Sequence, residues 1–168
     1  QANNQLLSVT ETKLVDIDRW LKNGQSTLKQ MLVEESVEWD IKNLATPEIS
    51  YQAGETQQFL DRLAIQDTFT AFFVYTPEGE VVLASDSAQI DKSVALQPYY
   101  QDSLKGSHVQ PPYYDVASST MTMIVSEPIY GVEGDLIGVL AGKVDVNTLS
   151  NIMTNRVGLG DTGETYLV

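Results

Sequence analysis

The sequence lacks cysteine, has one histidine and has few basic residues. Without cysteine, disulfides, thiol catalysis and thiolate metal sites are excluded. The single histidine, His108, would have to serve any nucleophile–histidine–acid triad, and no serine stands in a nucleophile-elbow pattern. We therefore interpret His108 as a solvated loop residue. The sequence predicts neither an enzyme nor a metal or organic cofactor.

Positive charge and long apolar runs are also scarce. Ten lysines and arginines against 23 acids give a formal net charge of −13, so most of the surface would repel a nucleic acid. The longest apolar runs, such as AFFV and LIGVLAG, are far too short to span a membrane. What remains is an ordinary globular composition, with 42% hydrophobic residues, in a chain long enough for one domain with a core.

Residues 5–44 show the spacing of a long helix. Leucines recur every seven residues at positions 7, 14, 21 and 28, and this is the period of a helix with one apolar seam. The seam fits a helix that lies on its own domain, and it also fits pairing with a second copy of the chain. Pro47 ends the pattern, since proline disfavours a helical residue before it.

The rest of the chain predicts an antiparallel sheet accompanied by helices. TAFFVYTPEGEVVLASD has two β-branched and aromatic runs around a turn with proline early and glycine late, which predicts a hairpin. Short turns between the later strands favour an antiparallel sheet with helices on one face, an α+β fold. The further expected elements are a helix after Gly54, a short helix near Pro98, strands at 113–116, 120–127 and 136–144, a helix at 146–156, and a strand at 164–168.

The segment GLGDTG, residues 158–163, matches the dinucleotide-binding pattern in letters only. That pattern requires a strand before it and a helix after it, and here the expected order is the reverse. We interpret the segment as a linker. The strand that follows it has no later partner, so we expect it to begin a second module.

Two tyrosine pairs, in QPYY and PPYYD, leave two interpretations open. They can be aromatic layers that cover the sheet, with the phenols reaching water or backbone. They can also form the wall of a ligand pocket. Adjacent residues of a strand point to opposite faces, so Tyr113 and Tyr114 cannot both face one pocket.

Several segments, in this order along the chain, resemble the double Cache sensor domain of bacterial and archaeal chemoreceptors, sensor histidine kinases and diguanylate cyclases. They are FFVYTPEGEVVLASD, QPYYQDSLKG, PPYYDVASSTMTMIVSEPIY, LIGVLAGKVDVNTLSNIM and GLGDTGETYLV. The resemblance implies a long N-terminal helix (1–44), a PAS-like membrane-distal module (45–156), and a linker with the first strand of a membrane-proximal module (157–168). It also implies an extracytoplasmic location, membrane segments outside this chain, and a homodimer formed through the N-terminal helix.

The resemblance further implies a pocket for a small molecule in the distal module. The positions that match the ligand-binding residues of the amino-acid-binding branch are Lys92, Gln97, Tyr99, Tyr100, Tyr113 and Asp145. Gln97 stands where that branch has an arginine for the ligand carboxylate, and Lys92 where it has a tyrosine. A glutamine cannot form the bidentate, charge-assisted hydrogen bonds that arginine makes with a carboxylate. The expected class of ligand therefore includes amines, amino acids and related metabolites.

Asp145 has two interpretations of its own. A carboxylate at the end of an apolar strand is costly unless a cation or hydrogen-bond donors face it, which favours a role in holding a cationic ligand group. Asp145 also precedes VNTLSNIM, where it can cap the expected helix. For the whole chain we expect a sensor module, with a protein-interaction or structural module that has no small ligand as the alternative.

Overall fold

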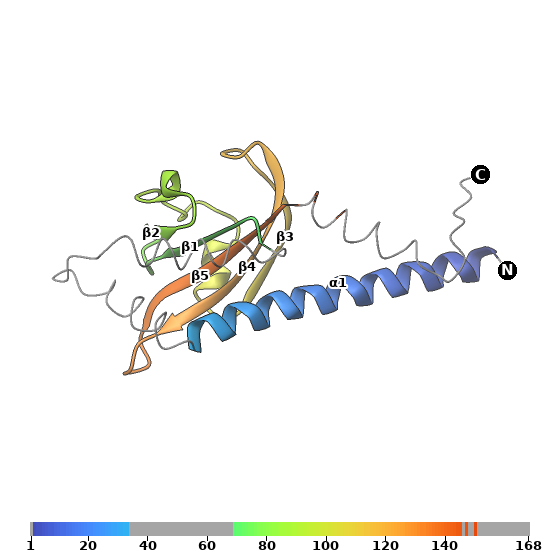
Figure 1. Ribbon diagram of the computed structural model, residues 1–168, viewed down its shortest axis with the longest axis horizontal. Coiled ribbons are helices and arrows are strands. Elements are labelled where there is room, and N and C mark those ends of the chain that lie inside the picture. Colours follow the sequence, from blue (N-terminus) through green and yellow to red (C-terminus); the bar gives the residue numbers. More distant parts are fainter. Residues whose placement is uncertain (1, 34–68, 146, 148–149, 151–168) are drawn as a thin grey trace.

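The computed structural model describes residues 2–33, 69–145, 147 and 150 (Figure 1). A long helix, α1 (Ala2–Val33), runs along one face of a five-stranded sheet, and its N-terminal part projects past the sheet. The sheet consists of β1 (Ala71–Tyr75), β2 (Val81–Ala84), β3 (His108–Asp115), β4 (Thr120–Tyr130) and β5 (Leu136–Asp145). Two short helices, η1 (Ser87–Gln89) and α4 (Tyr100–Ser103), lie in the connection between β2 and β3.

The strands are antiparallel to their neighbours, in the order β2-β1-β5-β4-β3. β1 and β2 form the expected hairpin, in which the Gly79 N–H donates to the Thr76 carbonyl at 2.8 Å. Gly79 has φ 90°, a backbone conformation that glycine adopts without a steric cost. β5 lies at the centre, which suits its almost uninterrupted apolar sequence.

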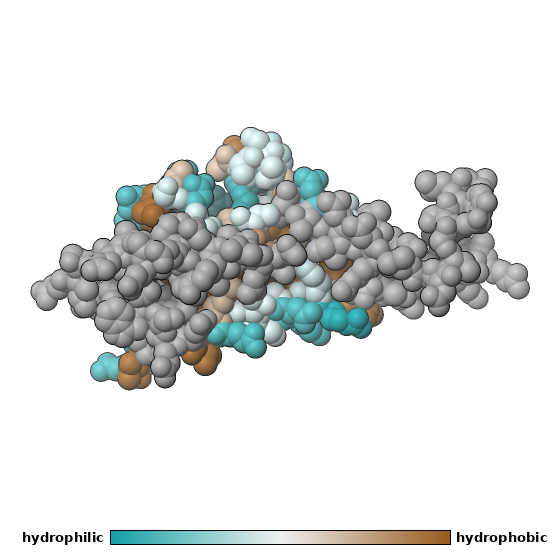
Figure 2. Space-filling view, in the orientation of Figure 1, coloured by the Kyte–Doolittle hydropathy of each residue, from teal (hydrophilic) through white to brown (hydrophobic). Residues whose placement is uncertain are grey.

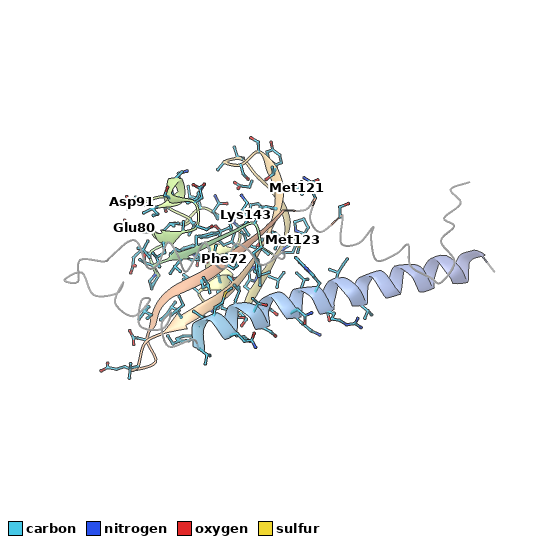
Figure 3. All side chains as sticks on the ribbon, in the orientation of Figure 1. Phe72, Glu80, Asp91, Met121, Met123 and Lys143 are labelled. Carbon is cyan, nitrogen blue, oxygen red and sulfur yellow. The ribbon has the colours of Figure 1, made fainter. Side chains whose placement is uncertain are left out.

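Each face of the sheet has its own apolar core, because strand residues alternate between faces. On the α1 side, Leu28 and Met31 of the helix pack with residues such as Phe72 and Met123. On the opposite side, the connection that carries η1 and α4 packs over the sheet with Tyr99 and other residues. In Figure 3, Phe72 and Met123 lie nearer to α1 than Lys143 does.

The exposed residues of α1 are mostly polar, with Val15 and Val33 as exceptions. Asp18 and Lys22 form an exposed ion pair at 2.7 Å, and the space-filling view is largely hydrophilic along the part of α1 that it leaves visible (Figure 2). Among the described residues, no helix combines the length and apolar character that crossing a membrane requires.

The predicted α+β fold is confirmed, with two differences in detail. The strand expected from residue 113 begins at His108, and it accommodates Pro111 and Pro112 through a register shift between Gln110 and Tyr113. Proline is tolerated there because β3 is an edge strand. The expectation of helices on one face only is wrong, since the η1–α4 connection covers the second face.

Several predictions fall outside the described residues. These are the continuation of the first helix to residue 44, the helix after Gly54, the strand at 164–168, and the helix at 146–156 apart from residues 147 and 150, which are helical. The domain boundaries at residues 44 and 156 therefore stay predictions.

Candidate functional site

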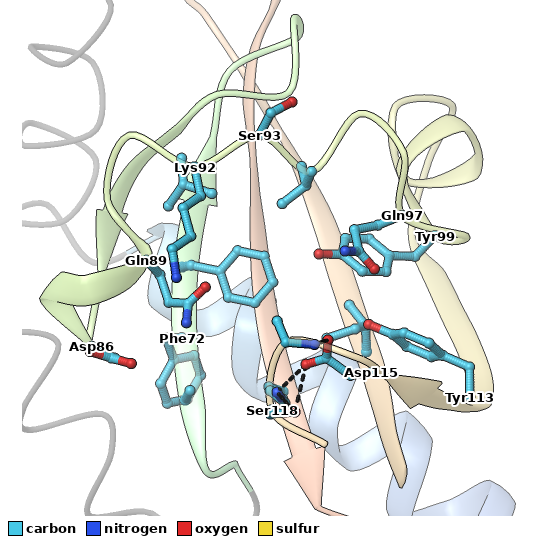
Figure 4. A pocket seen from close by; sticks show the side chains of 17 residues that line it. Phe72, Asp86, Gln89, Lys92, Ser93, Gln97, Tyr99, Tyr113, Asp115 and Ser118 are labelled. Carbon is cyan, nitrogen blue, oxygen red and sulfur yellow. Dashed lines mark hydrogen bonds and ion pairs between the residues drawn. The ribbon is translucent and has the colours of Figure 1, made fainter. Parts of the chain in front are cut away.

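A pocket of about 280 Å³ lies on the face of the sheet opposite α1 (Figure 4). Three parts of the chain enclose it: the sheet itself, the connection after β2, and the turn that follows β3. Its polar and aromatic lining includes Phe73 and Lys143 from the sheet, Asp86, Gln89, Lys92, Ser93, Gln97 and Tyr99 from the connection, and Tyr113, Asp115 and Ser118 from the end of β3 and its turn.

Tyr99 and Tyr113 form an aromatic wall. Their ring centroids are 6.2 Å apart with a 49° angle between the planes, and Phe73 lies 6.3 Å from Tyr99. Figure 4 shows both phenol oxygens directed into the pocket. Neither hydroxyl forms a hydrogen bond with a described residue, although Tyr99 is only 3% exposed. The wall therefore presents two free phenol groups to the cavity.

These two phenols stay protonated at physiological pH. Burial raises the pKa of Tyr99, and interactions with Tyr113, Tyr75 and Asp115 raise it further. Burial also raises the pKa of Tyr113, with a further contribution from Asp115. Each hydroxyl can therefore donate one hydrogen bond and accept others from a bound molecule.

A hydrogen-bonded layer behind the wall holds it in place. Tyr75 donates to the Ser103 hydroxyl at 2.6 Å, and Ser103 donates to the Tyr100 carbonyl at 2.6 Å. Burial raises the pKa of Tyr75 to about 12, although the Ser103 hydrogen bond acts in the opposite direction. The Tyr100 hydroxyl donates to the Pro77 carbonyl at 2.6 Å, which ties α4 to the β1–β2 turn.

An ion pair between Asp115 and Lys143 forms one side of the pocket. The Lys143 Nζ is 2.7 Å from Asp115 Oδ2, and the two side chains are 22% and 13% exposed. Ser118 donates to the same carboxylate oxygen at 2.6 Å, and the Ala117 N–H donates to the other at 3.0 Å. Burial alone would raise the pKa of Asp115, but the Lys143 and Ser118 hydrogen bonds outweigh it and lower that pKa.

The mouth of the pocket is lined by the connection after β2. Backbone hydrogen bonds hold this segment to β2: Val81 N–H donates to the Lys92 carbonyl at 2.9 Å, and Asp91 N–H donates to the Val81 carbonyl at 2.9 Å. The side chains of Gln89 and Lys92 lie on one side of the opening and Gln97 on the other (Figure 4). Within the described part of the chain, the Lys92 side chain has no ion-pair partner.

Four of the six predicted site residues line this single pocket: Lys92, Gln97, Tyr99 and Tyr113. Tyr100, which we expected in the wall, is not among the lining residues, because its hydroxyl is directed to Pro77. Asp145 is the last residue of β5 and pairs with Thr122 of β4; its side chain lies outside the described residues. Tyr114 is 58% exposed, as the alternation from Tyr113 predicts.

Sequence reasoning missed the Asp115–Lys143 pair, and also Gln89, Asp86 and Ser118. A signal for Asp115 was present, because it lies two residues after Tyr113 on the same strand and so on the same face. Lys143 offered a weaker signal, as a single charge within an apolar strand. Among the described residues, no group of three or more histidine, aspartate or glutamate side chains could hold a metal ion.

The comparison with protein families is decisive for the class of this chain. The family model of the Cache domain, in its double Cache form, matches residues 1–168. The chain belongs to the double Cache family. Cache domains are extracytoplasmic sensor domains of membrane receptors, and this chain is one of them. No curated protein matches the sequence.

Solved sensor domains share the fold at low sequence identity. The sensor domain of the Vibrio cholerae histidine kinase DctB is 18% identical with a TM-score of 0.61, over 93% of this chain and 62% of that one. The ligand-binding domain of the Pseudomonas aeruginosa chemoreceptor PctC, in complex with GABA, is 19% identical with a TM-score of 0.62. The match covers 90% of this chain and 65% of that one.

The ligand-binding domain of the Pseudomonas fluorescens chemoreceptor CtaA, in complex with L-alanine, is 19% identical with a TM-score of 0.64, over 90% of this chain and 63% of that one. This chain thus spans less than two thirds of the length of these sensor domains. At such identities the similarity concerns the fold, and the roles of individual residues must come from this chain itself.

Proposed function

We propose that this chain is the ligand-binding sensor module of a transmembrane signalling receptor, and that the pocket on the sheet binds an amino acid, an amine or a related metabolite. The free phenol hydroxyls of Tyr99 and Tyr113 carry the proposal. Both hydroxyls face the cavity and have no partner among the described residues, so they are available to a molecule that occupies it. Tyr100, which does not line the pocket, instead donates its hydroxyl to the Pro77 carbonyl.

The size and lining of the pocket support a small polar ligand. A volume of about 280 Å³ lies at the small end of ligand pockets. Lys92 and Gln97 offer hydrogen-bond donors for an acceptor group. The aromatic faces of Tyr99 and Tyr113 suit a cationic group, a contact worth about 0.5–2 kcal/mol. Asp145, at the end of β5, remains our proposed partner for that cation.

The position of the pocket suggests how binding reaches the rest of the receptor. β4 and β5 have the pocket on one face, and α1 packs against their other face. A ligand changes the equilibrium between two states only if it binds them with different affinity. We propose that the two states differ in how α1 sits on this sheet and pairs with its counterpart in a homodimer. The membrane segments of that receptor would lie outside this chain.

The test is a thermal-shift screen with amines, amino acids and carboxylic acids, followed by calorimetry on the compounds that raise the melting temperature. A ligand at 100 times its Kd should stabilise the protein by about 2.7 kcal/mol. Tyr113→Phe removes a hydroxyl that faces the pocket, and Tyr114→Phe is the matched control because Tyr114 faces solvent.

We expect Tyr113→Phe to weaken binding about tenfold, the effect of losing one hydrogen bond of roughly 1.4 kcal/mol. Tyr114→Phe should leave the affinity unchanged. The proposal fails if no compound of the panel binds, or if both variants bind a hit as well as the original chain does. A protein partner captured by a chain that binds no small molecule would favour the protein-interaction alternative.

A further inference from the structure

Asp115 and Lys143 form an ion pair within the lining of the pocket. Asp115 is the most buried carboxylate among the described lining residues, since Asp86 is exposed. Its carboxylate already accepts three hydrogen bonds, from Lys143, Ser118 and the backbone of Ala117. A carboxylate accepts about four. Asp115 therefore has little capacity left for the ammonium group of a ligand.

Lys143 would also repel such an ammonium group. Its Nζ lies 2.7 Å from Asp115 Oδ2, so a second cation at this carboxylate would sit beside a like charge in a partly buried place. Like charges in such surroundings disfavour each other strongly. The ion pair with Lys143 thus prevents Asp115 from binding the ammonium group of a simple amine.

Lys143 itself retains capacity for a ligand. An ammonium group has three N–H donors, and the described residues accept two of them, at Asp115 Oδ2 (2.7 Å) and at Ser118 Oγ (2.8 Å). Ser118 donates its own hydrogen to Asp115, so it is the acceptor toward Lys143. The third donor has no acceptor among the described residues, and Lys143 lines the pocket.

We propose that Lys143 sets the ligand class of this pocket, by closing Asp115 to ammonium groups and offering its remaining N–H donor to a carboxylate of the ligand. The inference rests on the proposed function and narrows it to molecules that carry a carboxylate. The other donors of the pocket agree with it: Lys92 is a second cation at the mouth, and Gln89 and Gln97 add amide groups.

Three probes with one four-carbon skeleton test the inference: butyrate, n-butylamine and γ-aminobutyrate. Calorimetry measures their affinity for the chain of 168 residues and for Lys143→Met, with Lys105→Met as the matched control. Lys105 is exposed and pairs with Asp102 outside the pocket lining. Because Lys143→Met leaves Asp115 buried without its partner, the double variant Asp115→Asn/Lys143→Met provides a second protein without that defect.

We expect the unmodified chain and Lys105→Met to bind butyrate and γ-aminobutyrate at least about tenfold more tightly than n-butylamine, the value of one charge-assisted hydrogen bond. Lys143→Met should lose about tenfold in butyrate affinity and gain affinity for n-butylamine, because Asp115 becomes free. The double variant should lose butyrate binding without gaining n-butylamine binding.

Two outcomes overturn the inference and differ in what else they overturn. If n-butylamine binds the unmodified chain as tightly as butyrate does, or if butyrate affinity survives both Lys143 variants, Lys143 does not select the ligand, and the pocket remains a sensor site. If none of the probes and no compound of the wider panel binds, both the inference and the proposed function fail.

Discussion

Glu127 of β4 is a buried carboxylate whose ionisation should destabilise the folded chain. Glu127 is 4% exposed, and its Oε1 has no hydrogen-bond partner. Its Oε2 accepts from Ser107 at 2.6 Å, and the Lys29 Nζ of α1 is 3.8 Å from Oε1. Burial raises the pKa of Glu127, and Ser107 and Lys29 offset only part of that rise.

The direction of the pH effect follows from the raised pKa. An acid whose pKa is higher in the folded state binds its proton more tightly there than in the unfolded chain. Stability is therefore greatest below the unfolded pKa, near 4.5, and falls as pH rises through the folded pKa. The cost of the buried charge is therefore larger at pH 7 than at pH 4.

The magnitude comes from two opposing contributions. A buried group without a partner costs about 1–3 kcal/mol, and more when it carries a charge, so a neutral amide in this place costs less than the carboxylate. Lys29 is 61% exposed, so its attraction returns at most about 1 kcal/mol. Glu127→Gln keeps an acceptor for Ser107 and removes the charge, so we expect it to stabilise the chain by roughly 1 kcal/mol at pH 7, a rise of about 2–4 °C in Tm.

Thermal unfolding of the original chain and of Glu127→Gln at pH 7 and pH 4 measures this difference. The gain should be present at pH 7 and nearly absent at pH 4, where the glutamate is protonated in the folded chain. Lys29→Met is the control, and it should lower stability slightly at pH 7 only. A Glu127→Gln protein that is less stable at pH 7, or equally stabilised at both pH values, would refute the reasoning.

Two further predictions concern the sheet. Asp115→Asn should destabilise the chain by about 1–3 kcal/mol at pH 7, because it leaves Lys143 without its charged partner. Since the pKa of Asp115 is lowered in the folded chain, this difference in stability should disappear as the pH falls through that pKa. Equal denaturant midpoints of the two proteins at pH 7 would contradict the prediction. A Cβ at Gly142 would lie 2.5 Å from the Phe69 ring, so Gly142→Ala should cost about 1–3 kcal/mol. Gly106→Ala, with no atom within 4 Å of its Cβ, is the control, and equal melting temperatures would rule out the clash.

The sheet could be predicted from the sequence because local signals agree with the fold. The turn at Thr76–Gly79 and the apolar, β-branched run after Thr120 are signals that act over a few residues, and the structure confirms the hairpin and the strand that they predict. The start of β3 could not be predicted, since the two prolines argue against a strand. Only the edge position and the register shift make them acceptable, and both are properties of the assembled sheet.

Part of the candidate site could likewise be predicted from the sequence, and part of it could not. The alternation along β3 predicts that only one of Tyr113 and Tyr114 faces the pocket, because strand period is a local property, and the family resemblance indicates Tyr113. The family resemblance brought Lys92, Gln97 and Tyr99 to attention before the structure placed them together. The pairing of Asp115 with Lys143 joins residues 28 positions apart, and no local pattern indicates which strands become neighbours.

A crystal structure of the chain with a compound that raises its melting temperature tests the central claim most directly. We expect density for that compound in the pocket, against the wall formed by Tyr99 and Tyr113, with a polar atom of the ligand about 2.5–3.2 Å from a phenol oxygen. Density for the compound elsewhere on the chain, with only water in the pocket beside these two rings, would contradict the claim.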